Sequence, residues 1–234
     1  MPLNNANQRE RNEMFERKPL RQHVQKEILA RIADQRLPAG TRINESHLSA
    51  DMGISRTPLR EAMLGLEAVG FLNSDMGRGF LVPPISSDEF MQSQAMLSKM
   101  APYALGMAQP VPSGQIMELN NLLGRARMRV SQPGKDRGGI VADLIYRWCA
   151  LSINGCPNKM LVTDINRLEA LSRRCWNEAV ILGFEPAGMV ASYDQLYELL
   201  RTNHPDEAVM HWENHIAEFS AEAARHLPEA SLEI

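Results

Sequence analysis

The sequence predicts a mainly α-helical protein, with one small β-hairpin near the amino terminus and an all-helical region behind it. Three observations indicate this class. Residues 45–69 hold two short amphipathic patterns separated by a glycine. Residues 70–82 are typical of two short strands joined by a glycine-containing turn. From residue 87 onward, apolar residues recur every three or four positions, and proline and glycine signals separate the segments.

The amino-terminal part begins with a polar stretch and a first predicted helix. Residues 1–18 are interpreted as a flexible arm. Residues 20–36 are expected to form an amphipathic helix, which Pro38 and Gly40 would end. The apolar stripe of this helix holds Leu20, Val24, Ile28 and Ile32.

Two further helices are predicted on either side of Gly53, because glycine reaches a positive φ at little steric cost. Ser46 is expected to cap the helix before this turn. Ser55 and Pro58 mark the start of the helix after it, since a proline is well tolerated near the first helical position. The inward residues are Leu48 and Met52 in the first of these helices, and Leu59, Met63, Leu66 and Val69 in the second.

The opposite side of the helix after the turn begins with Arg56, Thr57 and Arg60. These residues lie at or near the helix N-terminus, where open backbone amides and the helix dipole favour phosphate. An arginine can also bind guanine in the major groove through two hydrogen bonds. For either arginine alone, ordinary solvation of an exposed helix face is the alternative.

A β-hairpin is predicted to follow, with strands over residues 70–73 and 80–82. Gly77 and Gly79 permit a sharp turn between them, and Arg78 would lie on its tip, within reach of the DNA backbone or the minor groove. Helix, turn, helix and hairpin together predict an N-terminal winged helix-turn-helix.

These residues closely resemble the GntR family of bacterial transcriptional regulators. The run SRTPLREA at 55–62, followed by the LEAVGF and GRGFLV segments, is similar to the family's DNA-binding signature, and AGTRIN at 39–44 is similar to its lead-in. The resemblance covers about residues 20–83. It implies operator contacts by Arg56, Thr57 and Arg60, positions near the DNA backbone for Ser46 and Ser55, a wing tip at Gly77, and a phosphate contact by Arg42.

The composition is consistent with this reading. Residues 1–80 carry a net charge of +2 and residues 81–234 a net charge of −5, so the mildly basic front end suggests a few well-placed contacts with DNA. Cys149, Cys156 and Cys175 have neither an even count nor CxxC spacing, and we expect reduced thiols. Without a run of 18 apolar residues or a secretory signal, the sequence predicts a cytoplasmic protein with no membrane partner.

The sequence divides into a DNA-binding domain at 19–83, a linker at 84–87 stiffened by prolines, an all-helical domain at 88–228 and a tail at 229–234. No convincing strand alternation follows the linker, so an all-α helical bundle is predicted. Its helices are expected at about 87–109, 113–131, 138–154, 157–183, 186–202 and 205–226.

The size and helix pattern of this region are similar to those of the FadR/FCD subgroup, in which the second domain binds a small effector and supplies the dimer contact. Many members hold a divalent metal there through an aspartate, a histidine four residues later, and two further histidines. In this sequence the four positions correspond to Asp143, Arg147, Tyr193 and His215. Because arginine cannot ligate a metal and adds a positive charge, we expect the metal site of the subgroup to be lost and no cofactor to be bound.

Arg147 instead suggests an effector-binding site for a small carboxylic acid or acyl compound, since a guanidinium pairs with a carboxylate through two hydrogen bonds. Asp143 would orient Arg147, while Tyr193 and His215 would donate further hydrogen bonds. The alternatives are a buried Asp143–Arg147 ion pair with no ligand role, or an Arg147 that points to solvent.

A second arrangement on the last predicted helix is a competing metal site. His211 and His215 are four residues apart, with Glu218 on the same face. The alternative is that His211 lies at the surface, beside a buried stripe that includes Trp212 and Ile216. The fourteen methionines are interpreted as core filling, although they would also suit a pocket for an apolar acyl chain.

The sequence therefore predicts a ligand-responsive repressor that binds a near-palindromic operator on double-stranded DNA as a homodimer. An all-helical enzyme using Asp143, His211 or His215 is one alternative, but the sequence has no nucleophile motif, phosphate loop or complete metal set. An architectural DNA-binding protein without an effector is the other.

Overall fold

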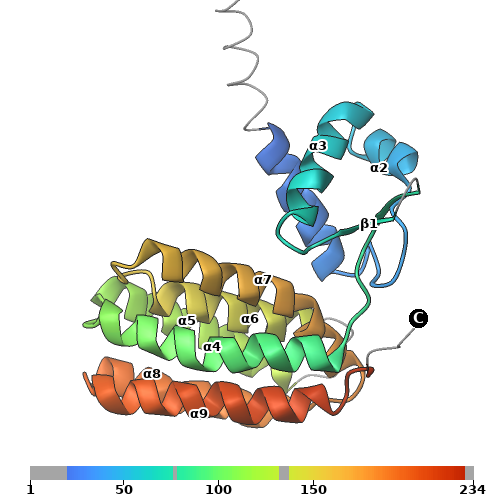
Figure 1. Cartoon of the computed structure of the whole chain (residues 1–234). Helices are drawn as coiled ribbons and strands as arrows, with labels where there is room; N and C mark the ends of the chain where they lie inside the picture. The colour runs from blue at the N-terminus through green and yellow to red at the C-terminus, as the bar shows by residue number, and fades with distance from the viewer. Residues whose placement is uncertain (1–19, 76–77, 132–136, 230–234) are drawn as a thin grey trace, which may run out of the picture. The chain divides into compact units, whose positions relative to one another are not determined.

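The computed structural model describes residues 20–75, 78–131 and 137–229. It divides into two compact units that meet between Pro84 and Ile85, and each unit is described here by itself. The predicted fold class is confirmed, because a helix-turn-helix with a small antiparallel hairpin precedes an all-helical unit (Figure 1). The predicted arm at 1–18, Gly77 and nearly all of the predicted tail at 229–234 lie outside the described residues.

The amino-terminal unit is built on a helix that covers residues 20–33, on α2 (Glu45–Asp51) and on α3 (Arg56–Glu67). Gly53 has a φ of +64° in the turn between α2 and α3, as predicted. The helices enclose a small core whose fully or nearly fully buried members are Val24, Ile28, Ile32, Ile43, Leu48, Leu59, Ala62, Met63, Leu66, Leu72, Phe80 and Val82.

Two predicted details of these helices are wrong. Asn44, and not Ser46, caps α2, because the Asn44 side chain accepts a hydrogen bond of 3.0 Å from the backbone N–H of His47. Val69 does not extend the buried stripe of α3, because the helix ends at Glu67 and Val69 remains 38% exposed. Asparagine and serine are about equally good caps, so the sequence alone did not decide between two neighbouring candidates.

The hairpin consists of β1 (Asn73–Asp75) and β2 (Gly79–Leu81), which pair antiparallel with Ser74 opposite Phe80. β1 therefore begins at Asn73, the last residue of the strand predicted at 70–73, and so begins three residues later than expected. Residues 40–43 lie along the other edge of β2, where Ile43 N–H donates to Phe80 O and Val82 N–H donates to Thr41 O, each at 2.9 Å. This lead-in completes the wing and was not predicted as part of the sheet.

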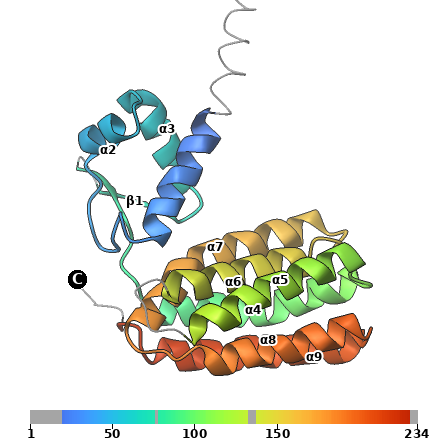
Figure 2. The ribbon, with the colours of Figure 1, turned by 180° about the vertical axis from the view of Figure 1, so that it is seen from behind.

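Within the described residues, the second unit contains six α-helices. They are α4 (Ser87–Ala108), α5 (Ser113–Val130), α6 (Arg137–Ser152), α7 (Lys159–Ile181), α8 (Ala187–Arg201) and α9 (Pro205–Ala224), as labelled in Figures 1 and 2. Each agrees with a predicted helix to within about two residues at either end. Proline, serine and asparagine at the helix starts explain this agreement, for example where Asn158 caps α7 and Pro205 begins α9.

The six helices form a closed ring. In this ring α4 packs against α7 and α9, α5 packs against α6 and α8, α6 packs against α7, and α8 packs against α9. The interior is apolar around Trp148, Trp212, Phe90 and Phe184, and a buried hydrogen bond of 3.0 Å from Gln94 Nε2 to Ser172 Oγ joins α4 to α7. No described helix is both long enough and apolar enough to span a membrane.

Candidate nucleic-acid interface and bundle interior

The N-terminal turn of α3 presents the side chains that the sequence assigned to DNA. Arg56, Thr57 and Arg60 are all exposed, whereas Leu59 and Met63 on the other side of the helix are completely buried. Ser55 is also exposed at the cap position, and its hydroxyl makes no capping hydrogen bond. The first amides of the helix therefore stay open, which leaves a cationic, donor-rich surface that suits phosphate and base edges.

Ser46 has a different place from the one predicted for a cap. It is exposed on α2, and its hydroxyl oxygen accepts a short hydrogen bond from Arg56 Nη2. The hydroxyl thus holds the guanidinium of α3 against α2. Arg60, in contrast, forms no hydrogen bond or ion pair with any described residue, so its guanidinium is available to an outside partner.

The wing carries two further arginines. Arg42 lies in the lead-in, forms an isolated bridge with Leu81, and makes an ion pair with Asp75 at the end of β1. Arg78 is exposed just before β2, and its backbone N–H donates to Asp75 O at 2.7 Å. Gly79 has a φ of +91°, which explains why glycine is needed at this corner. Arg78 therefore lies on the hairpin, and Arg42 lies in the lead-in beside β2.

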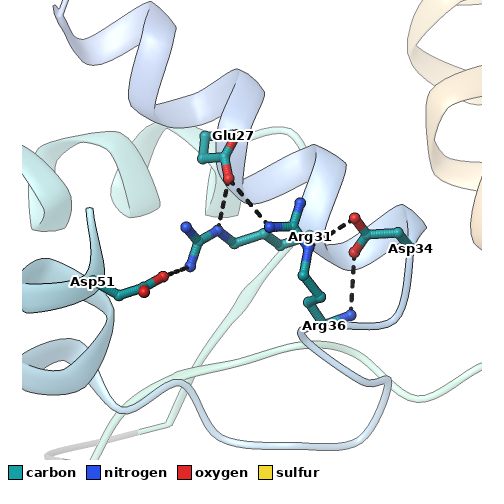
Figure 3. Close-up of polar contacts among 5 residues, drawn as sticks. All are labelled: Glu27, Arg31, Asp34, Arg36 and Asp51. Carbon is teal, nitrogen blue, oxygen red and sulfur yellow. Dashed lines mark hydrogen bonds and ion pairs between the residues drawn. The ribbon is translucent and has the colours of Figure 1, made fainter.

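A charged network fixes α2 to the helix at residues 20–33 (Figure 3). Arg31 pairs with Glu27 on its own helix at 2.8 Å and with Asp51 at the end of α2, and Arg36 pairs with Glu27 and Asp34. The hydrogen bond to Arg31 lowers the pKa of Asp51. The network sets the orientation of α2, against which α3 packs.

In the helical unit, the structure separates the four predicted effector residues into two pairs. Asp143 and Arg147 are half exposed on the side of α6 that faces away from its buried residues, and their ion pair measures 3.7 Å. Arg173 of α7 also pairs with Asp143, at 3.2 Å, and its guanidinium lies over the Tyr146 ring. The structure therefore contains the Asp143–Arg147 ion pair, but the pair is half exposed rather than buried as the first alternative had it.

Tyr193 and His215, in contrast, are buried inside the ring of helices. Their rings are 4.1 Å apart between centroids, and Tyr193 also lies 4.8 Å from Trp148. Nδ1 of His215 is 2.8 Å from the hydroxyl of Ser192, which is 3.0 Å from Nε2 of His211. Burial lowers the pKa of His215 to about 3, so this ring is neutral at physiological pH.

His211 is only partly buried, and it also lines an open groove of about 540 Å³ along α8 and the start of α9. The hydrogen bonds of Ser192 therefore connect this groove to the buried His215.

The interior also contains a carboxyl group that the sequence reading missed. Glu169 on α7 is 5% exposed and shares a hydrogen bond with the buried Cys149 of α6. Burial raises the pKa of Glu169 to about 8 and raises that of the neighbouring Cys149 thiol well above its ordinary value. The signal was present in the sequence, because Glu169 stands one turn after Ile165 within an apolar stripe.

The residues at the metal positions of the subgroup do not fit a metal ion. Arg147 and Tyr193 replace two of the ligands, and Asp143 lies on a different side of α6 from the interior that holds His215. The competing pair is also engaged otherwise, because His211 and His215 both contact Ser192 and Glu218 is exposed. Among the described residues, no group of three or more histidine, cysteine, aspartate or glutamate side chains is arranged to hold a metal ion.

Comparisons with known proteins agree with the DNA-binding assignment. Residues 20–82 match the model of bacterial regulatory proteins of the gntR family. The uncharacterized HTH-type transcriptional regulator YdhC of Bacillus subtilis (strain 168) is 38% identical over 65 residues, which is 26% of this chain and 29% of that protein. A probable D-xylose utilization operon transcriptional repressor of Paenarthrobacter nicotinovorans is 35% identical over 66 residues, which is 28% of this chain and 29% of that protein.

The chain thus matches less than a third of the length of these curated relatives. A solved structure of a putative transcriptional regulator GntR from Rhodococcus sp. RHA1 is similar over 87% of this chain and 96% of that chain. The TM-score is 0.73 at 12% sequence identity, so the two proteins share a fold across both units.

Proposed function

We propose that this chain, whose residues 20–82 match the model of bacterial regulatory proteins of the gntR family, is a DNA-binding transcriptional regulator. The observation that carries this proposal is the first turn of α3, where Arg56, Thr57 and Arg60 are exposed above a helix whose other side is buried. A helix of this kind enters the major groove with its N-terminal residues against the base edges. The family and the fold are those of regulators rather than of enzymes.

We expect the exposed arginines to contact two different parts of the DNA, the base edges and the phosphate backbone. Arg60, without a protein partner among the described residues, is the best candidate for a bidentate contact with guanine. Arg42 and Arg78 on the wing would contact phosphates or the minor groove, which positions α3 but carries little sequence information.

We further propose a homodimer that acts as a repressor at a near-palindromic operator, because two-fold protein symmetry is matched by two half-sites. The helical unit has a surface that suits self-association. Met96, Tyr103 and Met107 on α4 are 52%, 62% and 37% exposed, and their spacing of seven and four residues places them on one face. Such a face favours the dimer contact that the FadR/FCD resemblance implies.

The helical unit would bind the effector that controls the regulator. Tyr193 and His215 in the interior remain the best-placed members of the predicted effector set, because they are buried and in contact. A carboxylic acid has a second candidate location on the outer side of α6. There Arg147 and Arg173 share the single carboxylate of Asp143, which leaves one positive charge unpaired.

The DNA-binding proposal is tested by electrophoretic mobility shift with the protein's own promoter region. We expect Arg60→Ala to weaken specific binding by about 1–3 kcal/mol, or roughly 5- to 150-fold, as for the loss of one bidentate base contact. Arg225→Ala, which removes an exposed arginine at the end of α9, is the matched control and should bind as the wild type does.

Circular dichroism and size-exclusion chromatography would show that both variants keep their fold and oligomeric state. Unchanged affinity of Arg60→Ala at physiological salt would contradict the assignment of α3. Shifts of equal strength on unrelated DNA would favour an architectural protein, and catalytic turnover of a small molecule without any DNA binding would favour the enzyme.

A further inference from the structure

The interior of the helical unit holds a carboxyl group for which the described residues provide no positive partner. Glu169 is 5% exposed, its hydrogen-bond partner is the neutral thiol of Cys149, and no described lysine or arginine forms an ion pair with it. A buried carboxyl group is normally paired with a cation or satisfied by several hydrogen bonds. Where neither is present, a ligand is the natural source of the missing charge.

Aromatic side chains surround the same region. Cys149 is next to Trp148 on α6, and the Trp148 ring lies against Tyr193, which in turn lies against His215. The pKa of Tyr193 is raised by burial and by the proximity of Glu169 and Cys149, which places all three groups in one neighbourhood. Aromatic faces together with one carboxylate are the recognition elements that proteins use for ammonium groups.

Two polar atoms on α6 lack a partner as well. Nε1 of Trp148 and Oγ of Ser152 are buried without a hydrogen bond, and the four-residue spacing places both side chains on one face of the helix. An indole N–H can only donate, so a ligand that satisfies it must carry an acceptor such as a hydroxyl oxygen.

We propose that the interior of the helical unit binds a small organic cation, an ammonium compound that also carries a hydroxyl oxygen, with Glu169 as its counter-ion. This inference rests on the proposed function, because it names the chemical class of the effector. The ammonium group pairs with Glu169 and lies against the rings of Trp148 and Tyr193, while the oxygen accepts from Trp148 or Ser152. A carboxylate at the same place would find no positive charge, since His215 is neutral there.

The binding step moves one proton. At pH 7 the carboxyl group of Glu169 is largely protonated, because its pKa is about 8. The titratable groups near Glu169 are Cys149 of α6 and Tyr193 of α8, with His215 of α9 against the Tyr193 ring, and each is neutral at this pH. From α4, the buried polar contact with α7 is made by Gln94, which does not titrate. A bound ammonium group would therefore displace close to one proton, and that proton comes from Glu169.

The test uses the full chain and a panel of probes of opposite charge. 2-Aminoethanol, choline and glucosamine supply ammonium groups with hydroxyls, whereas acetate, glycolate and citrate supply carboxylates. Thermal shift identifies binders, and titration calorimetry at pH 7 in phosphate and in MOPS, which differ in their enthalpy of ionisation, measures affinity and proton release. We expect at least one ammonium probe to bind the wild type with release of close to one proton, and the carboxylates to be inactive.

Two variants locate the site. Glu169→Gln keeps the shape of the side chain but removes the charge, and it should lose at least 30-fold in affinity for the ammonium probe and all of the proton release. Arg147→Ala, in the outer cluster, should bind the probe as the wild type does. Unchanged affinity in Glu169→Gln, binding of no ammonium probe, or binding of carboxylates alone with loss in Arg147→Ala would each overturn the proposal.

The outcome is separable from that of the DNA-binding proposal. Glu169 lies in the helical unit, so Glu169→Gln without any probe should shift promoter DNA as the wild type does. Ammonium binding without any DNA binding would leave the interior site standing and would refute the regulator. DNA binding without ammonium binding would support the regulator and would refute the interior site.

Discussion

Replacing Glu169 by glutamine should change how the stability of the helical unit depends on pH. The pKa of this carboxyl group is about 8 in the folded protein, against 4.5 for an ordinary glutamate. Between these two values the folded state holds a proton that the unfolded state has lost, so a rise in pH lowers the free energy of unfolding. At about 1.36 kcal/mol per pH unit, this one group lowers the free energy of unfolding by about 3 kcal/mol between pH 4.5 and 7.

His215 contributes with the opposite sign. Its pKa is about 3 in the folded protein and 6.5 as the ordinary value, so only the unfolded state binds the proton in that window and stability rises with pH. Between pH 4.5 and 6.5 the two slopes cancel. Above pH 6.5 Glu169 acts alone, and the wild type should lose about 2 kcal/mol by pH 8. Glu169→Gln should abolish this loss, and its free energy of unfolding should rise by about 3 kcal/mol from pH 4.5 to 6.5.

Urea unfolding at a series of pH values, followed by tryptophan fluorescence, measures this profile. All three tryptophans, Trp148, Trp176 and Trp212, lie in the helical unit, so the signal reports that unit alone. Glu218→Gln removes an exposed carboxyl group of α9 and is the control that should follow the wild type. A wild-type profile that is flat from pH 6.5 to 8, or a Glu169→Gln profile that falls as steeply as the wild type, would refute the reasoning.

Three further variants test the amino-terminal unit. Ser46→Ala removes the hydroxyl that accepts a hydrogen bond from Arg56. Operator affinity, measured by mobility shift at fixed salt, should fall about fivefold, which is the equivalent of one hydrogen bond. An unchanged affinity would contradict the positioning role of Ser46. Asp75→Asn removes the ion pair that engages Arg42, so binding to non-specific DNA should strengthen and its salt dependence should steepen by about one counter-ion. An unchanged salt dependence would show that Arg42 does not contact phosphate. Leu59→Ala opens a cavity in a fully buried position and should cost about 2–5 kcal/mol in urea unfolding monitored by circular dichroism; a cost below 1 kcal/mol would contradict the core assignment.

The DNA-binding unit was predictable because its signals are local. A glycine at the turn, the Ser-Arg-Thr-Pro helix start and an apolar stripe each depend on a few neighbouring residues, and the structure places Arg56 and Arg60 outward as these signals require. The errors arose where tertiary contacts decide. The lead-in segment at 40–43 bonds to β2 across almost forty residues, and the short strand β1 is defined by its register against β2 rather than by its own sequence.

The bundle interior was harder to predict because it depends on which side of each helix turns inward. Asp143 and Arg147 have the four-residue spacing of the metal ligands in the FadR/FCD subgroup. However, α6 buries Leu144 and Trp148, so Asp143 and Arg147 lie on its outer side. The apolar stripe that includes Leu144, Trp148 and Leu151 already indicated this orientation. Glu169 had no motif at all, and only its place inside an apolar stripe of α7 could have identified it.

The energy associated with Glu169 is of the right size to operate a switch. Between pH 4.5 and 7 the raised pKa of Glu169 costs the folded protein about 3 kcal/mol, and an ammonium group that pairs with the carboxylate can recover part of this free energy. Effectors commonly couple to a second site with 1–3 kcal/mol, and a ligand can shift an equilibrium only by its differential affinity for the two states. If one arrangement of the regulator brings Glu169 to the ligand and the other does not, the ion pair that forms when Glu169 releases its proton to pair with the ammonium group supplies the coupling energy. The same argument predicts that Glu169→Gln binds operator DNA normally and no longer responds to the ammonium effector, which a mobility shift with and without the probe would measure.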